Sequence, residues 1–141
     1  MSYTPETVVD ALVTVLTNGM AAKVAALNIE YTDDIVLVVM KAYYVAEQSA
    51  IPEYPVITIL AERGTPADFA GDWDWKLRVI VVATDQDPTT LRRMLSRYIR
   101  AICEILAASA AQPMSFDGID YSPMFGRAGT FLSDASVQIT A

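Results

Sequence analysis

The sequence predicts an α+β fold: a mostly antiparallel sheet with an N-terminal helix and a long amphipathic helix, at about residues 88–109, packed on it. Three observations predict this fold: a helical pattern of apolar residues near the N-terminus, several short runs rich in β-branched residues, and a second helical pattern directly after the longest run. The order helix, strands, helix, strands is typical of folds that separate their helices from an antiparallel sheet. With 141 residues, 53% of them hydrophobic, the chain is expected to form one domain, residues 1–141, around its own core.

The composition argues against catalysis. The chain has no histidine and one cysteine, Cys103, which excludes His-based triads, imidazole zinc ligands and an intrachain disulfide. Neither a glycine-rich phosphate loop nor a GxSxG elbow occurs. Cys103 falls on the apolar face of a predicted helix and is expected to be a buried small hydrophobe. We therefore expect no enzymatic activity, no cofactor and no functional metal.

The charge and the hydropathy pattern indicate a protein made in the cytoplasm, without a membrane. A net charge of −7 repels nucleic acid phosphates on average. The longest apolar run, Ile35–Met40, is far shorter than the roughly 20 residues of a membrane span. The acidic N-terminal stretch MSYTPETVVD has no apolar segment of a signal peptide behind it.

The first element is a predicted helix at about residues 5–27. Thr4 is a plausible N-cap, with Pro5 at the first helical position. Apolar residues then recur at helical spacing: Val8, Val9, Leu12, Val13, Val15 and Leu16. Asn18-Gly19 is expected to end or bend this helix, and Met20–Leu27 are expected to continue it.

Two short strands are predicted next, at Ile35–Met40 and Val56–Ala61, because both runs are rich in β-branched residues. Pro52 and Pro55 interrupt regular structure between them, so the intervening stretch is expected to be an extended connection. That connection carries Tyr43, Tyr44 and Tyr54. These tyrosines are either lids on the core or contacts to another subunit.

A longer strand is predicted at Trp73–Thr84. Its odd positions are apolar, whereas its even positions are polar until Ile80 and Val82. This pattern predicts a strand that enters the centre of a sheet and becomes buried on both faces. We expect it to pair antiparallel with residues 56–63 through the loop at residues 62–72. That loop is longer than a tight hairpin requires.

A long amphipathic helix follows at once. Asp87 is a strong N-cap and Pro88 suits the first helical position. Apolar residues recur through four turns: Leu91, Met94, Leu95, Tyr98, Ile99, Ile102, Cys103, Ile105 and Leu106. Two further β segments, MSFDGIDYSPMF and GTFLSDASVQIT, are predicted in the tail.

This helix also carries Arg93, Arg97 and Arg100, which form one stripe beside its apolar face. Three interpretations stay open for the stripe: a solvated helix surface, pairing with acids of a neighbouring protein surface such as another copy, and contact with nucleic acid.

The chain resembles the tail terminator (tail-to-head joining) proteins of long-tailed bacteriophages. The resemblance covers most of the chain and lies in the order of its segments. These are TPETVVDALVTVLT, KAYYVAEQSAIPEYPVITI, WKLRVIVVATDQDP, TTLRRMLSRYIRAICEIL and the closing strands.

The resemblance implies a structural virion protein at the tail–neck junction, assembled in the bacterial host cytoplasm. In that family, six copies form a homohexameric ring at the head-proximal end of the tail tube, where the ring ends tube polymerisation. The implied partners are further copies of the chain, the tail tube protein and the head–tail connector or stopper protein. The genome DNA would pass through the lumen without specific binding, which suits an acidic wall.

Candidate contact residues follow from residue type and expected exposure, because aromatic residues and arginine dominate interface energetics. They are Arg63, Asp68, Phe69, Trp73, Tyr43, Tyr44, Tyr54, Arg93, Arg97 and Arg100. For Trp73 and its neighbour Trp75, core packing is an equal alternative.

Three other functions stay open. The chain could be a different neck or head-completion connector. It could be a small-molecule-binding or enzymatic α+β domain whose cleft uses Tyr43, Tyr44 and the tryptophans. It could also be an adaptor that binds a peptide strand at a sheet edge.

Overall fold

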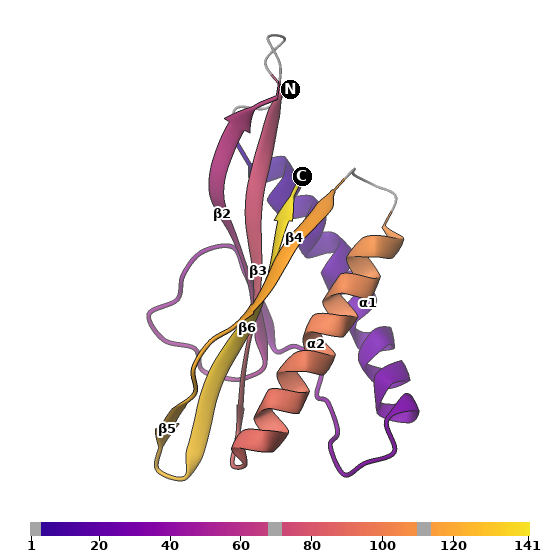
Figure 1. Cartoon of the computed structure of the whole chain (residues 1–141), viewed down its shortest axis with the longest axis vertical. Coiled ribbons are helices and arrows are strands. Elements are labelled where there is room, and N and C mark those ends of the chain that lie inside the picture. The colour runs from indigo at the N-terminus through magenta and orange to yellow at the C-terminus, as the bar shows by residue number, and fades with distance from the viewer. Residues whose placement is uncertain (1–3, 68–71, 110–113) are drawn as a thin grey trace.

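The computed structural model describes residues 4–67, 72–109 and 114–141. Within them, two helices lie on one face of a six-stranded, mostly antiparallel sheet, so the predicted α+β class is confirmed (Figure 1). In chain order, the elements are α1 (Glu6–Glu30), β1 (Ala42–Tyr44), β2 (Val56–Pro66), β3 (Trp73–Asp85), α2 (Pro88–Ala108), β4 (Ser115–Tyr121), β5 (Phe125–Arg127) and β6 (Thr130–Thr140).

The strands are arranged in the order β1-β2-β3-β6-β4, and β5 pairs with the other end of β6. Among the strands of the described residues, only β1 and β2 pair in parallel. The predicted antiparallel pairing of β2 and β3 is confirmed, and Val79 of β3 lies opposite Ile59 on one side and Val137 on the other. The sheet therefore has β1 at one edge, and β4 and β5 at the other.

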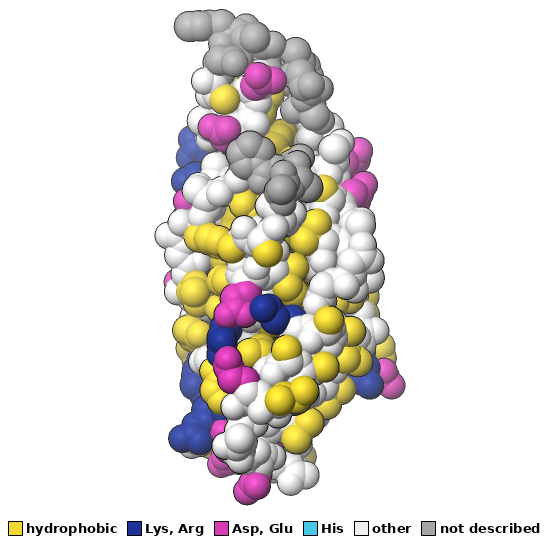
Figure 2. Space-filling view, turned by 90° about the vertical axis from the view of Figure 1, so that its right-hand side faces the viewer, with side chains coloured by type: hydrophobic (Ala, Val, Ile, Leu, Met, Phe, Trp, Pro, Cys, Tyr) yellow, Lys and Arg dark blue, Asp and Glu magenta, His cyan; other side chains and the backbone are white. Residues whose placement is uncertain are grey.

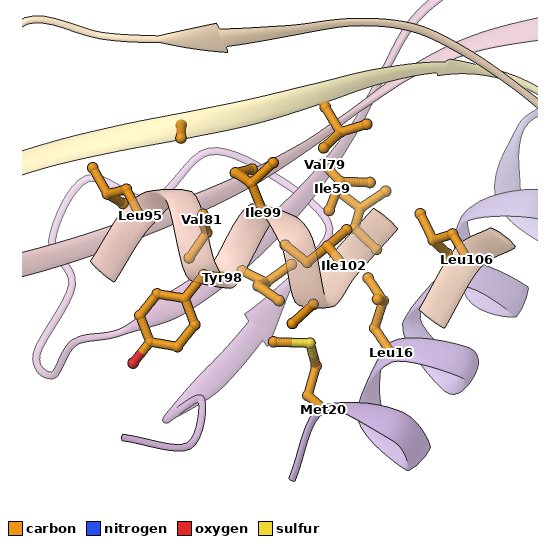
Figure 3. Close-up of a cluster of buried hydrophobic side chains, with 14 of the residues drawn as sticks. Leu16, Met20, Ile59, Val79, Val81, Leu95, Tyr98, Ile99, Ile102 and Leu106 are labelled. Atoms are coloured by element: carbon orange, nitrogen blue, oxygen red, sulfur yellow. The ribbon is translucent and has the colours of Figure 1, made fainter. Parts of the chain in front are cut away.

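The core lies between the helices and one face of the sheet. Leu95 and Ile99 of α2 lie over Val79 and Val81, and α1 adds Leu16 and Met20 (Figure 3). The odd positions of β3 from Leu77 to Ala83 are buried, because alternate side chains of a strand point to one face.

The second face of the sheet has no helix over it in the described part of the chain. Ile80 and Val82 point to this face and are only half-buried. The expectation that the inner half of β3 is buried on both faces is therefore wrong. The central position of the strand, which pairs on both sides, is as expected.

The predicted N-terminal helix is confirmed, and it passes through Asn18-Gly19 without a break up to Glu30. Gly19 faces Ile105 of α2: a Cβ on Gly19 would lie 3.1 Å from the Ile105 Cγ2 atom. Glycine thus allows a close approach of the two helices. The proposed N-cap is wrong, because Pro5 is the capping residue, and no side chain of residues 4–67 caps α1.

The strand predicted at Ile35–Met40 does not form. Its backbone bonds to side chains: Asn28 donates to the Leu37 carbonyl (2.9 Å) and accepts from the Leu37 N–H (2.8 Å). The Tyr98 hydroxyl accepts from the Val38 N–H (3.0 Å) and donates to the Val38 carbonyl (2.6 Å). The only strand before Val56 in the described residues is β1, within the stretch expected to be an extended connection.

The second helix begins and ends as predicted to within one residue. The Asp87 carboxylate accepts hydrogen bonds from the Thr90 N–H (2.9 Å) and hydroxyl (2.8 Å), as an N-cap should. The last predicted strand is β6, whereas the preceding segment is divided into β4 and β5. Ala128 and Gly129, both with positive φ (53° and 79°), form the turn from β5 to β6.

Candidate assembly surfaces

The ends of β2 and β3 form an arm that reaches beyond the helices (Figure 1). Trp73 and Trp75 stack on it, with ring centroids 6.1 Å apart. The Trp75 ring covers Gly64 so closely that a Cβ there would lie 2.5 Å from it. Arg63 is exposed and lies opposite Lys76 in the ladder. Like charges at opposed positions repel, and Asp74, opposite Thr65, is exposed on the same arm, so the arm offers charges of both signs to a partner.

Two candidate contact residues, Asp68 and Phe69, lie outside the described residues. The three candidate tyrosines have different surroundings. Tyr43 faces the core, where its hydroxyl donates to the Leu16 carbonyl (3.4 Å) and burial raises its pKa. Tyr44 points to the other face of the sheet, half-buried, and Tyr54 lines a surface hollow.

Arg97 is only 7% exposed. Its guanidinium forms a two-point ion pair with Asp33, whose pKa it lowers, and lies 3.8 Å from the centre of the Tyr31 ring. Arg97 thus fixes the chain just after α1 against α2. The Arg97–Asp33 ion pair thus forms within one copy of the chain.

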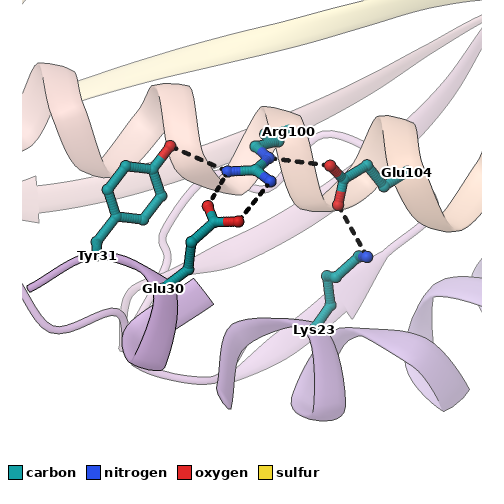
Figure 4. A network of polar contacts seen from close by, with 5 residues as sticks. All are labelled: Lys23, Glu30, Tyr31, Arg100 and Glu104. Atoms are coloured by element: carbon teal, nitrogen blue, oxygen red, sulfur yellow. Dashed lines mark hydrogen bonds and ion pairs between the residues drawn. The ribbon is translucent and has the colours of Figure 1, made fainter. Parts of the chain in front are cut away.

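Arg100 belongs to a network that joins the two helices (Figure 4). It pairs with Glu30 at the end of α1 and with Glu104 on its own helix, and it donates to the Tyr31 hydroxyl (3.2 Å). Glu104 also pairs with Lys23 (2.8 Å). The carboxylates of this network have lowered pKa values, chiefly through these hydrogen bonds.

Arg93 is the exposed member of the predicted stripe. The stripe is therefore divided: two arginines act within the fold, and one is free to contact another molecule. Sequence spacing could not show this division, because Asp33 and Glu30 lie 64 and 70 residues away from their arginines.

Two exposed apolar surfaces were not foreseen. The first, the valine surface, belongs to the segment that leads into and out of β1: Val36, Val38, Val39 and Val45, between 44% and 67% exposed. The second, the β4–β5 surface, lies on the strands at the other edge of the sheet, and its residues are between 43% and 71% exposed. Phe116, Ile119 and Tyr121 lie on the helix side, whereas Phe125, opposite Leu132 of β6, lies on the helix-free side. The sequence signal for the first surface was the β-branched run Ile35–Met40. Three of its valines are exposed, and the run does not pair with a strand.

The outer face of α1 is also apolar. Ile29 is 82% exposed, and four alanines, at positions 21, 22, 25 and 26, lie on the same half of the helix. By length and composition α1 passes the test for a membrane span, as core helices of soluble proteins also do, and it contributes Leu12, Leu16 and Met20 to the core. Figure 2 shows hydrophobic side chains spread over this side of the molecule around a group of charged ones.

Two hollows border these surfaces. One, of about 360 Å³, lies at the end of β3 beside the valine surface. The other, of about 620 Å³, is a groove between α1 and α2 that is lined mainly by small and apolar residues such as Gly19, Ala22 and Ile105.

Groups suited to catalysis do not come together in the part of the chain that the structure describes. No three His, Cys, Asp or Glu side chains there are placed to hold a metal ion. Cys103 is half-buried, and burial raises the pKa of its thiol, which leaves less of the reactive thiolate. Neither a scan against protein-family models nor a search of curated proteins gives a match to this sequence.

Proposed function

We propose that this chain is a structural virion protein that forms a ring at the head-proximal end of a phage tail tube. There it ends tube polymerisation and joins the tail to the neck. The resemblance in the order of the segments supports this function. The observation that carries it is the pair of unlike apolar surfaces on different parts of the molecule, one around the segment before β1 and one on the edge strands β4 and β5.

Two unlike surfaces favour a particular kind of assembly. Contiguous exposed apolar surface on a soluble protein marks an interaction site. If the valine surface of one copy meets the β4–β5 surface of the next, the contact is heterologous, and such contacts close into rings when the rotation between copies permits. A two-fold dimer that pairs one surface with itself would leave the other surface exposed.

The β2–β3 arm is the part we assign to the tail tube. Its exposed Arg63 and its stacked tryptophans offer the residue types that dominate interfaces. It also lies at the end of the molecule away from the β5–β6 turn (Figure 1). An arm and a ring contact at different ends would let one copy bind its neighbours and the tube simultaneously.

Capping of tail tubes tests this function. Purified protein is added to polymerising tail tube protein, and tube lengths and ends are measured by negative-stain electron microscopy. We expect short tubes with a density at one end. A variant in which residues 65–74 are replaced by Asn-Gly should keep its circular dichroism and its rings, yet leave tubes uncapped. Capping by that variant would contradict the role of the arm, and uncapped tubes with the unchanged protein would contradict the function.

One observation favours a second candidate, a peptide-binding adaptor. All seven residues of β4 are exposed, so this edge strand is open to pairing with an extended peptide. An adaptor would stay monomeric at high concentration and leave tubes uncapped.

A further inference from the structure

We propose that the β5–β6 turn of one copy docks into the hollow at the end of β3 of the next copy, with Phe125 in its apolar part and Arg127 paired with Asp34. This inference rests on the proposed function, because it names the contact that would hold the ring together.

The inserted part is the β5–β6 turn. Phe125 is 71% exposed, and Arg127, two residues further along the same strand, projects to the same face. In the described part of the chain, β5 pairs with no strand but β6. The turn between them is a tight two-residue loop in which both residues have positive φ, a geometry typical of hairpins. The aromatic ring and the guanidinium are thus presented together on a short, well-defined projection.

The receiving part is the hollow of about 360 Å³. Its apolar lining comes from four segments: Ile35, Val36 and Val38 after α1, Pro55 before β2, Ala83 on β3 and Met94 on α2. A cavity of about 150 Å³ already accepts benzene, so a phenyl ring fits. Val36 and Val38 are exposed at this site, so an incoming ring would cover them as well.

The charges match. Asp34 and Asp85 bring carboxylates to the hollow. Asp85 is engaged, since it accepts a hydrogen bond from the Asp87 N–H (2.9 Å). The side chains of Asp34 and Arg127 each have no hydrogen bond or ion pair with any residue that the structure describes. Docking would therefore place Phe125 in the apolar part of the hollow and Arg127 beside Asp34. The attraction between these two charges would steer the copies together and fix their orientation.

The topology requires two copies. The turn lies beyond β6, whereas the hollow opens between β3, Pro55 and the segment after α1. Asp85 of the hollow lies opposite Phe131 of β6, which in turn lies opposite Gly126 of β5. Turn and hollow are therefore at the same height of the sheet, but on different faces: Phe125 and Arg127 lie on the helix-free face, whereas the hollow opens beside α2. The contact would thus join the helix-free side of one copy to the helix side of the next, around a ring.

The test exchanges the two charges. Asp34→Arg and Arg127→Asp are each expected to prevent assembly, measured by light scattering after gel filtration and by negative-stain microscopy. An equimolar mixture of the two variants should restore rings, because in a ring where they alternate every contact again joins one carboxylate to one guanidinium. Phe125→Ala should weaken self-association by about tenfold or more. Asp10→Arg, the same charge change at the far end of α1, is the matched control and should assemble normally. At concentrations too low for rings to form, all variants should melt as the unchanged protein does.

The outcomes separate the inference from the function on which it rests. Rings that form equally well with either single variant, or a mixture that stays unassembled, would overturn the docking of turn into hollow and leave the proposed ring intact. An unchanged protein that stays monomeric alone and on tail tubes would overturn both.

Discussion

At the scale of single residues, long-range pairs between α2 and the end of α1 decide how the helices meet. Arg97 binds Asp33, and Arg100 binds Glu30. The positions of the arginines were read correctly from the sequence, but their partners were not, because nothing local marks an acid that folding brings near. The same holds for Tyr98, which was predicted as an apolar core residue and also binds the backbone of Val38.

The Arg97–Asp33 pair predicts a pH dependence of stability. Arg97 lowers the pKa of Asp33 in the folded protein, so the pair stabilises the fold above the ordinary aspartate pKa of about 3.9 and loses this effect as the pH falls through the lower folded value. Asp33→Asn should therefore lower the urea midpoint at neutral pH, and its difference from the unchanged protein should shrink below about pH 4.

Asp34→Asn is the matched control for that experiment, because the Asp34 side chain has no bonded partner in the described residues. It should leave the urea midpoint of the dilute protein unchanged. A midpoint for Asp33→Asn that differs from the unchanged protein by the same amount at every pH would contradict the account of the pair.

Tyr98 predicts a second effect on stability. Its ring is fully buried and its hydroxyl serves both backbone groups of Val38; burial also raises its pKa to about 12. Tyr98→Phe keeps the ring but leaves the N–H and the carbonyl without this partner, which should cost about 1–3 kcal/mol in the free energy of unfolding. Urea denaturation measures it, and an unchanged free energy would mean that other groups or water satisfy Val38.

At the scale of elements, the sequence was informative wherever a local rule decides. Asp87-Pro88 and the apolar spacing of α2 are local signals, and that helix was placed to within a residue. The prediction of a strand at Ile35–Met40 was wrong, because β-branched residues indicate that a segment suits a sheet and do not show that a partner strand lies beside it. Its partners turned out to be the side chains of Asn28 and Tyr98.

The candidate contact surfaces were predicted in part. Arg63 and Arg93 are exposed as expected, whereas Tyr43 and Arg97 are built into the fold. Phe125 was missed, because its exposure follows from the short strand β5 at the sheet edge and is not marked by residue type.

The β5–β6 turn allows a prediction at this scale. Ala128 has a φ of 53°, a left-handed conformation that costs an L-residue roughly 1–2 kcal/mol and costs glycine almost nothing. Ala128→Gly should therefore raise the melting temperature slightly, offset in part by the greater entropy of glycine in the unfolded chain. A clear decrease in the melting temperature would contradict the assigned turn geometry.

At the scale of the whole molecule, one core and a set of polar contacts hold two helices on a sheet, and two apolar surfaces stay exposed, one around the segments that flank β1 and one on β4 and β5. A monomer gains nothing from such surfaces, whereas a ring would cover both with one repeated contact. The outer face of α1, apolar along its second half, is a further surface that an assembly would cover.

Negative-stain electron microscopy of the purified protein, over a range of concentrations and then with tail tubes, tests the central claim most directly. The ring account predicts closed particles with a central hole, or tubes closed at one end by such a particle. Monomers at every concentration, together with tubes that remain open in their presence, would contradict it.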